Sequence, residues 1–177
     1  PGFYCREVHA NPGLTLLTLG PLSNVARAVQ QCPDTMRLVG RLVILGGARF
    51  GGNKTPVTEF NFWQDPEAAA IVLDAGLPAT VVLLDAFTDP SVSQKELDKL
   101  FAKGAPAIQF LAPAIQQYAN VQIANGGQAS IPDAVAAALA VAAAVGEQRP
   151  AFVQIVLAPG LSRGQSVLGL AANDKIA

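Results

Sequence analysis

The segment that decides the fold is residues 41–47, which read RLVILGG, an apolar and β-branched run ended by two glycines. Such a run predicts a buried strand. A polar segment, GGNKTPVTEFN at 51–61, comes next, and Asp65-Pro66-Glu67 then predicts a helix with Asp65 as its cap and Pro66 as its first residue. The polar segment therefore lies in a loop after a strand, which is where ligands bind in open α/β sheets.

Strand-like and helix-like segments alternate along the chain. Strands are predicted at 14–19, 42–45 and 79–84, helices at 24–31, 66–75, 93–103 and 107–120, and a late strand pair at 152–157 and 166–170. This alternation predicts an α/β fold, a mostly parallel sheet with helices on both faces, in the manner of a Rossmann-like open sheet. No repeat or low-complexity linker divides the chain, so residues 1–177 are expected to form one domain.

Composition excludes some partners. The 177 residues are 51% hydrophobic, and 12 Lys and Arg nearly balance 13 Asp and Glu. Without a basic stripe, nucleic acid is not an expected partner. The longest apolar run, 134–145, is too short to cross a bilayer and is interpreted as a buried helix that begins near Asp133, so no membrane partner is expected. No signal peptide is visible, and a cytoplasmic location is expected.

One carboxylate and two amide side chains in the loop suit a ligand that carries hydroxyl groups. An extended backbone would place Glu59 and Asn61 on one face, with Phe60 pointing into the core, and Asn53 could join them if the loop folds back. A carboxylate beside two amides suits a sugar. The same residues also suit a structural role, with Asn53 in a turn and the other two capping the next helix. Spacing alone leaves both interpretations open.

Several segments together resemble the inosine-uridine preferring nucleoside hydrolases. The central signature of that family is similar to LGG at 45–47, GN at 52–53, EFN at 59–61 and DPEAA at 65–69. Further similarity lies in LTLLTLGPLSNVA at 14–26, VLLD at 82–85 and LSRGQSV at 161–167. The resemblance covers most of the chain and implies a nucleoside hydrolase-like fold.

The resemblance also implies a reaction and the residues for it. Members hydrolyse ribonucleosides in purine and pyrimidine salvage, with a Ca²⁺ ion that binds a water and the ribose hydroxyls. Asn53, Glu59 and Asn61 would bind the ribose. The backbone carbonyl of Leu19 and the carboxylate of Asp133 would be metal ligands, which makes Asp133 a catalytic candidate. A homo-oligomer, dimer or tetramer, is implied as well.

The chain departs from the family pattern in two places. No Asp-x-Asp-Pro-Gly-x-Asp-Asp run is present, and the chain begins at Pro1 within what resembles a helix, so we interpret it as a fragment that lacks the N-terminal third and the C-terminal helix. This chain alone is expected to be inactive. Pro132 stands where the family has the His that protonates the leaving base, so base preference does not carry over. A non-catalytic nucleoside or sugar binding protein remains the alternative.

The two cysteines, Cys5 and Cys32, have neither metal-type spacing nor a histidine partner. They are expected to be reduced thiols in the core rather than a disulfide or a nucleophile.

Overall fold

The structure is a computed structural model that describes residues 1–88, 91–124, 129–142 and 146–170. Two compact units make up the chain: Pro1–Asp85 with Ala136–Ala177, and Ala86–Val135. The fold is α/β with a parallel sheet, as the alternating pattern predicts, and the single domain expected over the whole chain stays a prediction.

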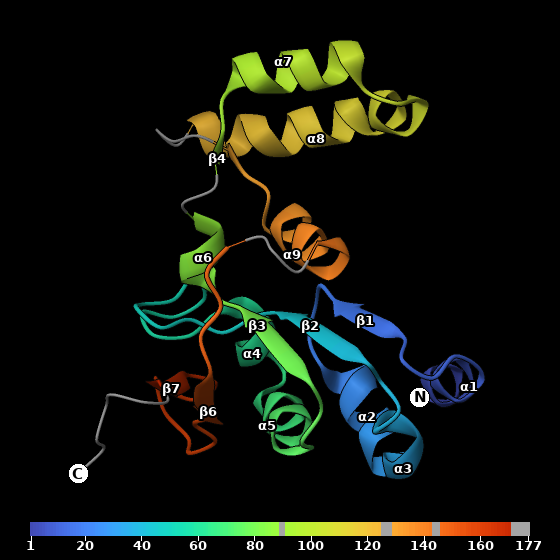
Figure 1. Cartoon of the computed structure of the whole chain (residues 1–177). Helices are drawn as coiled ribbons and strands as arrows, with labels where there is room; N and C mark the ends of the chain where they lie inside the picture. The colour runs from blue at the N-terminus through green and yellow to red at the C-terminus, as the bar shows by residue number, and fades with distance from the viewer. Residues whose placement is uncertain (89–90, 125–128, 143–145, 171–177) are drawn as a thin grey trace. The chain divides into compact units, whose positions relative to one another are not determined.

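The first unit is built on a three-stranded parallel sheet (Figure 1). Its strands are β1 (Thr15–Thr18), β2 (Arg41–Leu45) and β3 (Ala79–Val82), in the order β1-β2-β3. The register pairs Thr18 with Ile44 and Leu45 with Val82. All three strands therefore end at the same edge of the sheet, and β2 lies in its centre.

Five helices of the segment Pro1–Asp85 and a hairpin of the segment Ala136–Ala177 also belong to this unit. The helices are α1 (Gly2–Ala10), α2 (Ser23–Gln31), α3 (Pro33–Met36), α4 (Phe60–Gln64) and α5 (Pro66–Asp74), and the antiparallel hairpin is β6 (Ala151–Ile155) with β7 (Ser166–Leu170). The expected helices and strands are present with bounds close to those predicted. Two short helices, α3 and α4, were not predicted.

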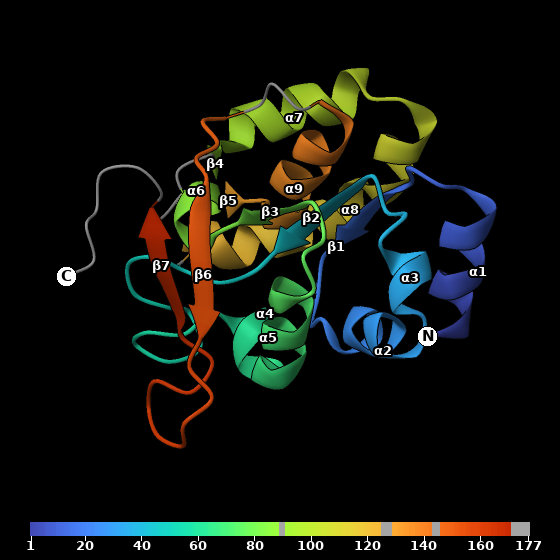
Figure 2. The ribbon, with the colours of Figure 1, turned by 60° about the horizontal axis from the view of Figure 1, so that its bottom comes forward.

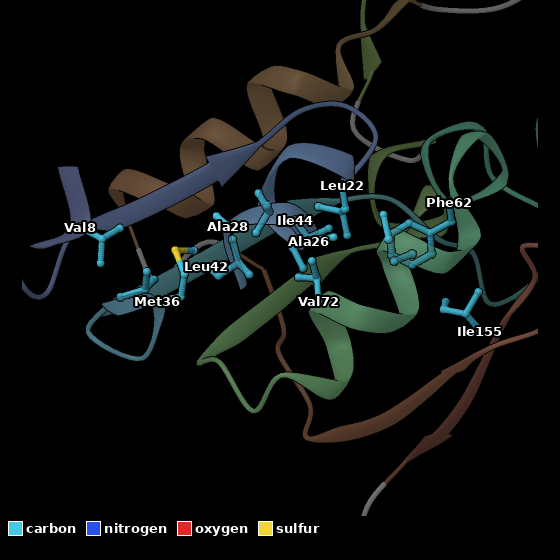
Figure 3. Packing of buried hydrophobic residues seen from close by; sticks show 14 residues of the cluster. Val8, Leu22, Ala26, Ala28, Met36, Leu42, Ile44, Phe62, Val72 and Ile155 are labelled. Carbon is cyan, nitrogen blue, oxygen red and sulfur yellow. The ribbon is translucent and has the colours of Figure 1, made fainter. Parts of the chain in front are cut away.

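Both faces of β2 are buried, as its unbroken apolar run indicates. Leu42 and Ile44 pack with Val25, Ala28 and Val72 of α2 and α5, which lie side by side against the sheet (Figures 2 and 3). Val43 and Leu45 alternate to the other face and are also buried. Burial on both sides fixes the register of the strand, and with it the position of the loop that follows.

Phe62 and Ile155 extend the same core toward the hairpin. Phe62, from α4, has no exposed surface, and Ile155 is the last residue of β6 (Figure 3). The core thus reaches from α1 to the hairpin and includes the helix that follows the polar loop.

The expectation of reduced thiols is wrong, because Cys5 and Cys32 form a disulfide. Cys5 lies in α1, which packs against α2 and α3, and Cys32 lies between those two helices. Their Cα atoms are 6.2 Å apart, which is within the range that a disulfide spans. The separation of 27 residues in sequence conceals this proximity.

The second unit is a helical hairpin closed by a short strand pair. Its elements are β4 (Ser91–Val92), α7 (Gln94–Lys103), α8 (Pro106–Ala124) and β5 (Ala129–Ser130), while α6 (Leu84–Thr88) and α9 (Pro132–Val141) span its two boundaries. Leu97, Ala119 and Ala129 form its core. Among the residues placed in the structure, no helix is long and apolar enough to span a bilayer.

Candidate functional site

The loop after β2 is held in a defined conformation by its own backbone and by one carboxylate. The Asp85 carboxylate accepts hydrogen bonds from the N–H groups of Arg49 (2.7 Å) and Phe50 (3.0 Å). Further along, the N–H of Lys54 donates to the carbonyl of Thr58 at 3.1 Å. The polar residues of the loop therefore start from fixed backbone positions.

Glu59 is a buried carboxylate that caps α4. Only 3% of its surface is exposed. Its Oε2 accepts from the N–H groups of Gly47 (3.0 Å), Asn61 (2.9 Å) and Phe62 (3.1 Å), and its Oε1 accepts from Asn61 (2.9 Å). Burial raises the pKa of Glu59 above its ordinary value, and these N–H bonds act in the opposite direction. The capping role that the sequence left open is thus present.

Both asparagines are tied to the same helix terminus. The Asn61 side chain is buried, and its Nδ2 donates to the carbonyl of Leu45, the last residue of β2, at 2.9 Å. Asn53, which is exposed, accepts a hydrogen bond from the N–H of Phe60 through its Oδ1 at 2.9 Å. The structure therefore brings Asn53, Glu59 and Asn61 together at the start of α4.

The extended backbone expected from Glu59 to Asn61 is present only at Glu59, and its continuation through Phe60 and Asn61 is wrong. Helix α4 begins at Phe60, whose side chain is 46% exposed, and Phe62 is the residue that enters the core. The capping bonds from Glu59 start a helix at this point, so the side-chain period changes from two residues to 3.6. Asn61 reaches the end of β2 from the first turn of that helix.

The glycines that end β2 leave room for Phe62. A Cβ atom on Gly46 would lie 2.5 Å from the Phe62 ring, and one on Gly47 would lie 2.8 Å from it. Gly47 also has a φ of 73°, in the left-handed region. The close approach of this ring brings α4, and with it Glu59, against the end of the strand.

Two side-chain pairs at the start of α5, Ser23 with Asp65 and Arg163 with Glu67, were not predicted from the sequence. Asp65 caps α5 through the N–H of Ala68, as predicted, and also accepts a hydrogen bond from Ser23. Arg163, from the late hairpin, contacts both oxygens of Glu67 at 2.6 and 2.7 Å and holds the pKa of that carboxyl below its ordinary value. No local pattern signals such pairing between residues that lie 96 positions apart.

Leu19 and Asp133 lie in different units. Leu19 follows β1, and because Thr18 pairs with Ile44, its carbonyl belongs to the sheet edge where Asn61 binds Leu45. Asp133 is exposed in the first turn of α9, after Pro132, which suits the first position of a helix. The joint role of the two residues as metal ligands stays a prediction.

Their oxygen atoms are of the kind that a hard cation binds, but they are few. Calcium takes about six to eight oxygen ligands. Across the described ranges, which omit 89–90, 125–128, 143–145 and 171–177, no three His, Cys, Asp or Glu side chains gather at one place. One backbone carbonyl and one carboxylate would therefore supply only part of the ligand set of such an ion.

Comparisons with known proteins identify relatives over most of these residues. A pyrimidine-specific ribonucleoside hydrolase RihB from Escherichia coli O1:K1 is 33% identical over 119 residues, 67% of this chain and 38% of the relative. A pyrimidine-specific ribonucleoside hydrolase RihA from Citrobacter koseri is 36% identical over 99 residues, 56% of this chain and 32% of the relative. The chain thus spans less than half the length of these two curated relatives.

Solved structures share the fold. The plant nucleoside hydrolase PpNRh1 superposes with a TM-score of 0.86 at 28% identity and covers 94% of this chain and 54% of its own. A purine-preferring ribonucleoside hydrolase from Gardnerella vaginalis gives a TM-score of 0.81 at 27% identity, over 93% of this chain and 54% of its own. The family model of the inosine-uridine preferring nucleoside hydrolases matches residues 2–176. A match over that range, together with the loop and the fold, shows that this chain belongs to the inosine-uridine preferring nucleoside hydrolase family.

Proposed function

We propose that the protein containing this chain hydrolyses the N-glycosidic bond of ribonucleosides and releases ribose and a free base. The observation that carries the proposal is the buried pair of Glu59 and Asn61, fixed by backbone hydrogen bonds at the carboxyl end of β2. Sheets of this class bind their ligands at that end. Family membership and the names of the relatives support the same reaction.

The hydrogen bonds within the loop leave acceptor capacity for a ribose. Oε1 of Glu59 accepts one N–H bond where Oε2 accepts three. Within the described residues, the Oδ1 of Asn61 accepts no hydrogen bond, since only its Nδ2 is engaged. In our proposal these two oxygens, with the Nδ2 of Asn53, bind the 2′ and 3′ hydroxyls.

The fixed carboxylate also suits the transition state. Glycosidic cleavage passes through an oxocarbenium-like state in which positive charge develops on the sugar ring. A carboxylate held in place by N–H groups requires no reorganisation to stabilise that charge. Binding by Glu59 and Asn61 should therefore be stronger in the transition state than in the ground state, which raises kcat.

The complete protein would use Ca²⁺, with Leu19 and Asp133 among its ligands and other residues completing the set. When bound, such an ion would lower the pKa of a water and make it a better nucleophile. The proposed substrate is a ribonucleoside without assignment of its base, because Pro132 replaces the family histidine. Homo-oligomerisation and a cytoplasmic location remain predictions.

Steady-state kinetics of the active protein with inosine and uridine tests this function. Glu59→Ala and Asn61→Ala should each lower kcat/KM by an amount equivalent to roughly 2–4 kcal/mol of lost transition-state stabilisation, because each variant loses a bond to a charged or buried partner. Part of this loss should appear as a fall in kcat. Asn11→Ala, which removes an exposed amide at the residue that follows α1, is the matched control and should leave both constants unchanged.

Normal kcat in both alanine variants would mean that Glu59 and Asn61 only cap and support α4. If the unmodified protein binds nucleosides but never turns them over, the chain belongs to a nucleoside-binding protein instead.

A further inference from the structure

We infer that Ser166 is a positioning residue for Glu59 and acts through the backbone of Gly47 and Ala48, an inference that rests on the proposed function of Glu59. Ser166 is the first residue of β7 and is buried. Its hydroxyl accepts a hydrogen bond from the N–H of Ala48 at 2.9 Å and donates one to the carbonyl of Ala48 at 2.7 Å. One side chain thus pairs both backbone groups of a residue 118 positions earlier.

Ala48 needs such a partner because it lies beyond the end of the sheet. The last β2–β3 contacts are those from the Gly46 N–H to Val82 (3.1 Å) and from the Leu84 N–H to Gly47 (2.8 Å). Ala48 is nevertheless buried. Buried backbone groups without a hydrogen-bond partner destabilise the fold, so the Ser166 hydroxyl supplies the partner that the sheet does not provide at Ala48.

Gly47 connects Ser166 to the Glu59 carboxylate, because the N–H groups of Gly47 and of the next residue, Ala48, bind these two side chains. The Gly47 N–H donates to Glu59 Oε2 at 3.0 Å. A Cβ atom on Gly47 would lie 2.8 Å from the Phe62 ring and 3.0 Å from the Ser166 Oγ, so the residue is closely packed against both side chains. A shift of Ala48 would turn the Gly47 N–H away from Oε2 and loosen the carboxylate.

The hairpin that carries Ser166 is itself anchored beside α4 and α5. The Gly164 N–H donates to Val156 at 2.8 Å, and a Cβ atom on Gly164 would lie 2.9 Å from the Trp63 Cα. Arg163 is paired with Glu67 of α5. Ser166 therefore reaches the glycine segment from a hairpin that contacts both α4, which Glu59 caps, and α5.

Amide hydrogen exchange measured by NMR tests the geometry without requiring activity. In Ser166→Ala, Ala48 loses its buried hydrogen-bond partner. The bond from the Gly47 N–H to Glu59 should then open more often, so exchange of the Gly47 N–H should accelerate about tenfold or more relative to the Ile44 amide within β2. Ser166→Thr keeps the hydroxyl and should restore protection. Val167→Ala, at the exposed neighbouring position, is the control. Unchanged relative protection in Ser166→Ala would overturn the inference.

Kinetics of the active protein tests the coupling to Glu59. Ser166→Ala should lower kcat about tenfold in the wild-type background and have little further effect in Glu59→Gln, because both changes disturb one carboxylate. If Ser166→Ala only reduces the fraction of correctly folded protein, kcat should fall by the same factor in the wild-type and Glu59→Gln backgrounds. That result would overturn the inference and leave the proposed function unaffected. Normal kcat in Glu59→Gln would overturn the proposed function first, and the positioning role with it.

Discussion

Gly46 and Phe62 form a close contact in which the ring occupies the space of a missing side chain. The Cβ atom of an alanine at position 46 would lie 2.5 Å from the ring, which has no exposed surface into which it could move. Gly46→Ala should therefore destabilise the protein by about 1–3 kcal/mol, as overpacked cores do. Urea unfolding measures this change.

Gly20→Ala is the matched control, because no atom lies within 4 Å of the position that its Cβ would take. Its free energy of unfolding should change little. In a Phe62→Leu background, which has no ring, the cost of Gly46→Ala should shrink, and an undiminished cost would mean that the contact is not its cause.

Glu59 shows how a structural and a chemical role meet in one side chain. The sequence pointed to a sugar ligand or to a helix cap as alternatives, and the structure contains the cap. The capping bonds hold a buried carboxylate in one orientation, which is what a ribose-binding acceptor requires. The two interpretations are therefore compatible, and the proposed ribose contact depends on the cap.

At the scale of the elements, the disulfide ties α1 to the junction of α2 and α3. The disulfide closes a loop between residues that are 27 positions apart. Closing such a loop reduces the conformational entropy of the unfolded chain and should stabilise the protein by about 3–4 kcal/mol. Urea unfolding with and without reductant should show this difference. A Cys5→Ser/Cys32→Ser double variant should unfold alike in both conditions, and an oxidised protein with an unchanged midpoint on reduction would contradict the prediction.

Elements with strong local signals could be predicted from the sequence. The β-branched run of β2 and the Asp65-Pro66-Glu67 start of α5 each carry their own signal, and both are present with bounds close to those expected. Helix α4 could not be predicted in this way. It has only five residues, FNFWQ, and its first turn is fixed by Glu59 and by the packing of Phe62.

The candidate site was only partly predictable for a related reason. The types and spacing of Asn53, Glu59 and Asn61 indicated a cluster, but their orientation depends on a helix that the spacing alone did not reveal. The contacts of Ser166 and Asp85 with the loop join residues that are far apart in sequence. Such pairings follow from the packing of whole elements, which local patterns do not encode.

For the molecule as a whole, we expect metal binding to require residues beyond those of this chain. The sequence contains no aspartate-rich run of the kind that supplies most calcium ligands in the family it resembles. Calorimetry of this chain with calcium chloride should therefore show no micromolar affinity, and inosine and uridine should not be hydrolysed. An Asp133→Asn variant is the control for weak binding at that carboxylate. Micromolar affinity or turnover of either nucleoside would contradict the prediction, and loss of that affinity in the variant would assign it to Asp133.

The contact of the glycine pair with Phe62 also limits how the gene can vary. A single-base change in a glycine codon yields another glycine codon, a stop, or a residue that has a Cβ atom. At Gly46 and Gly47 each such missense change would place that atom within 3 Å of the Phe62 ring. No single-base missense change is therefore free of this contact. A replacement at Gly46 requires a compensating change in Phe62, and one at Gly47 must also fit beside Ser166 with a left-handed backbone.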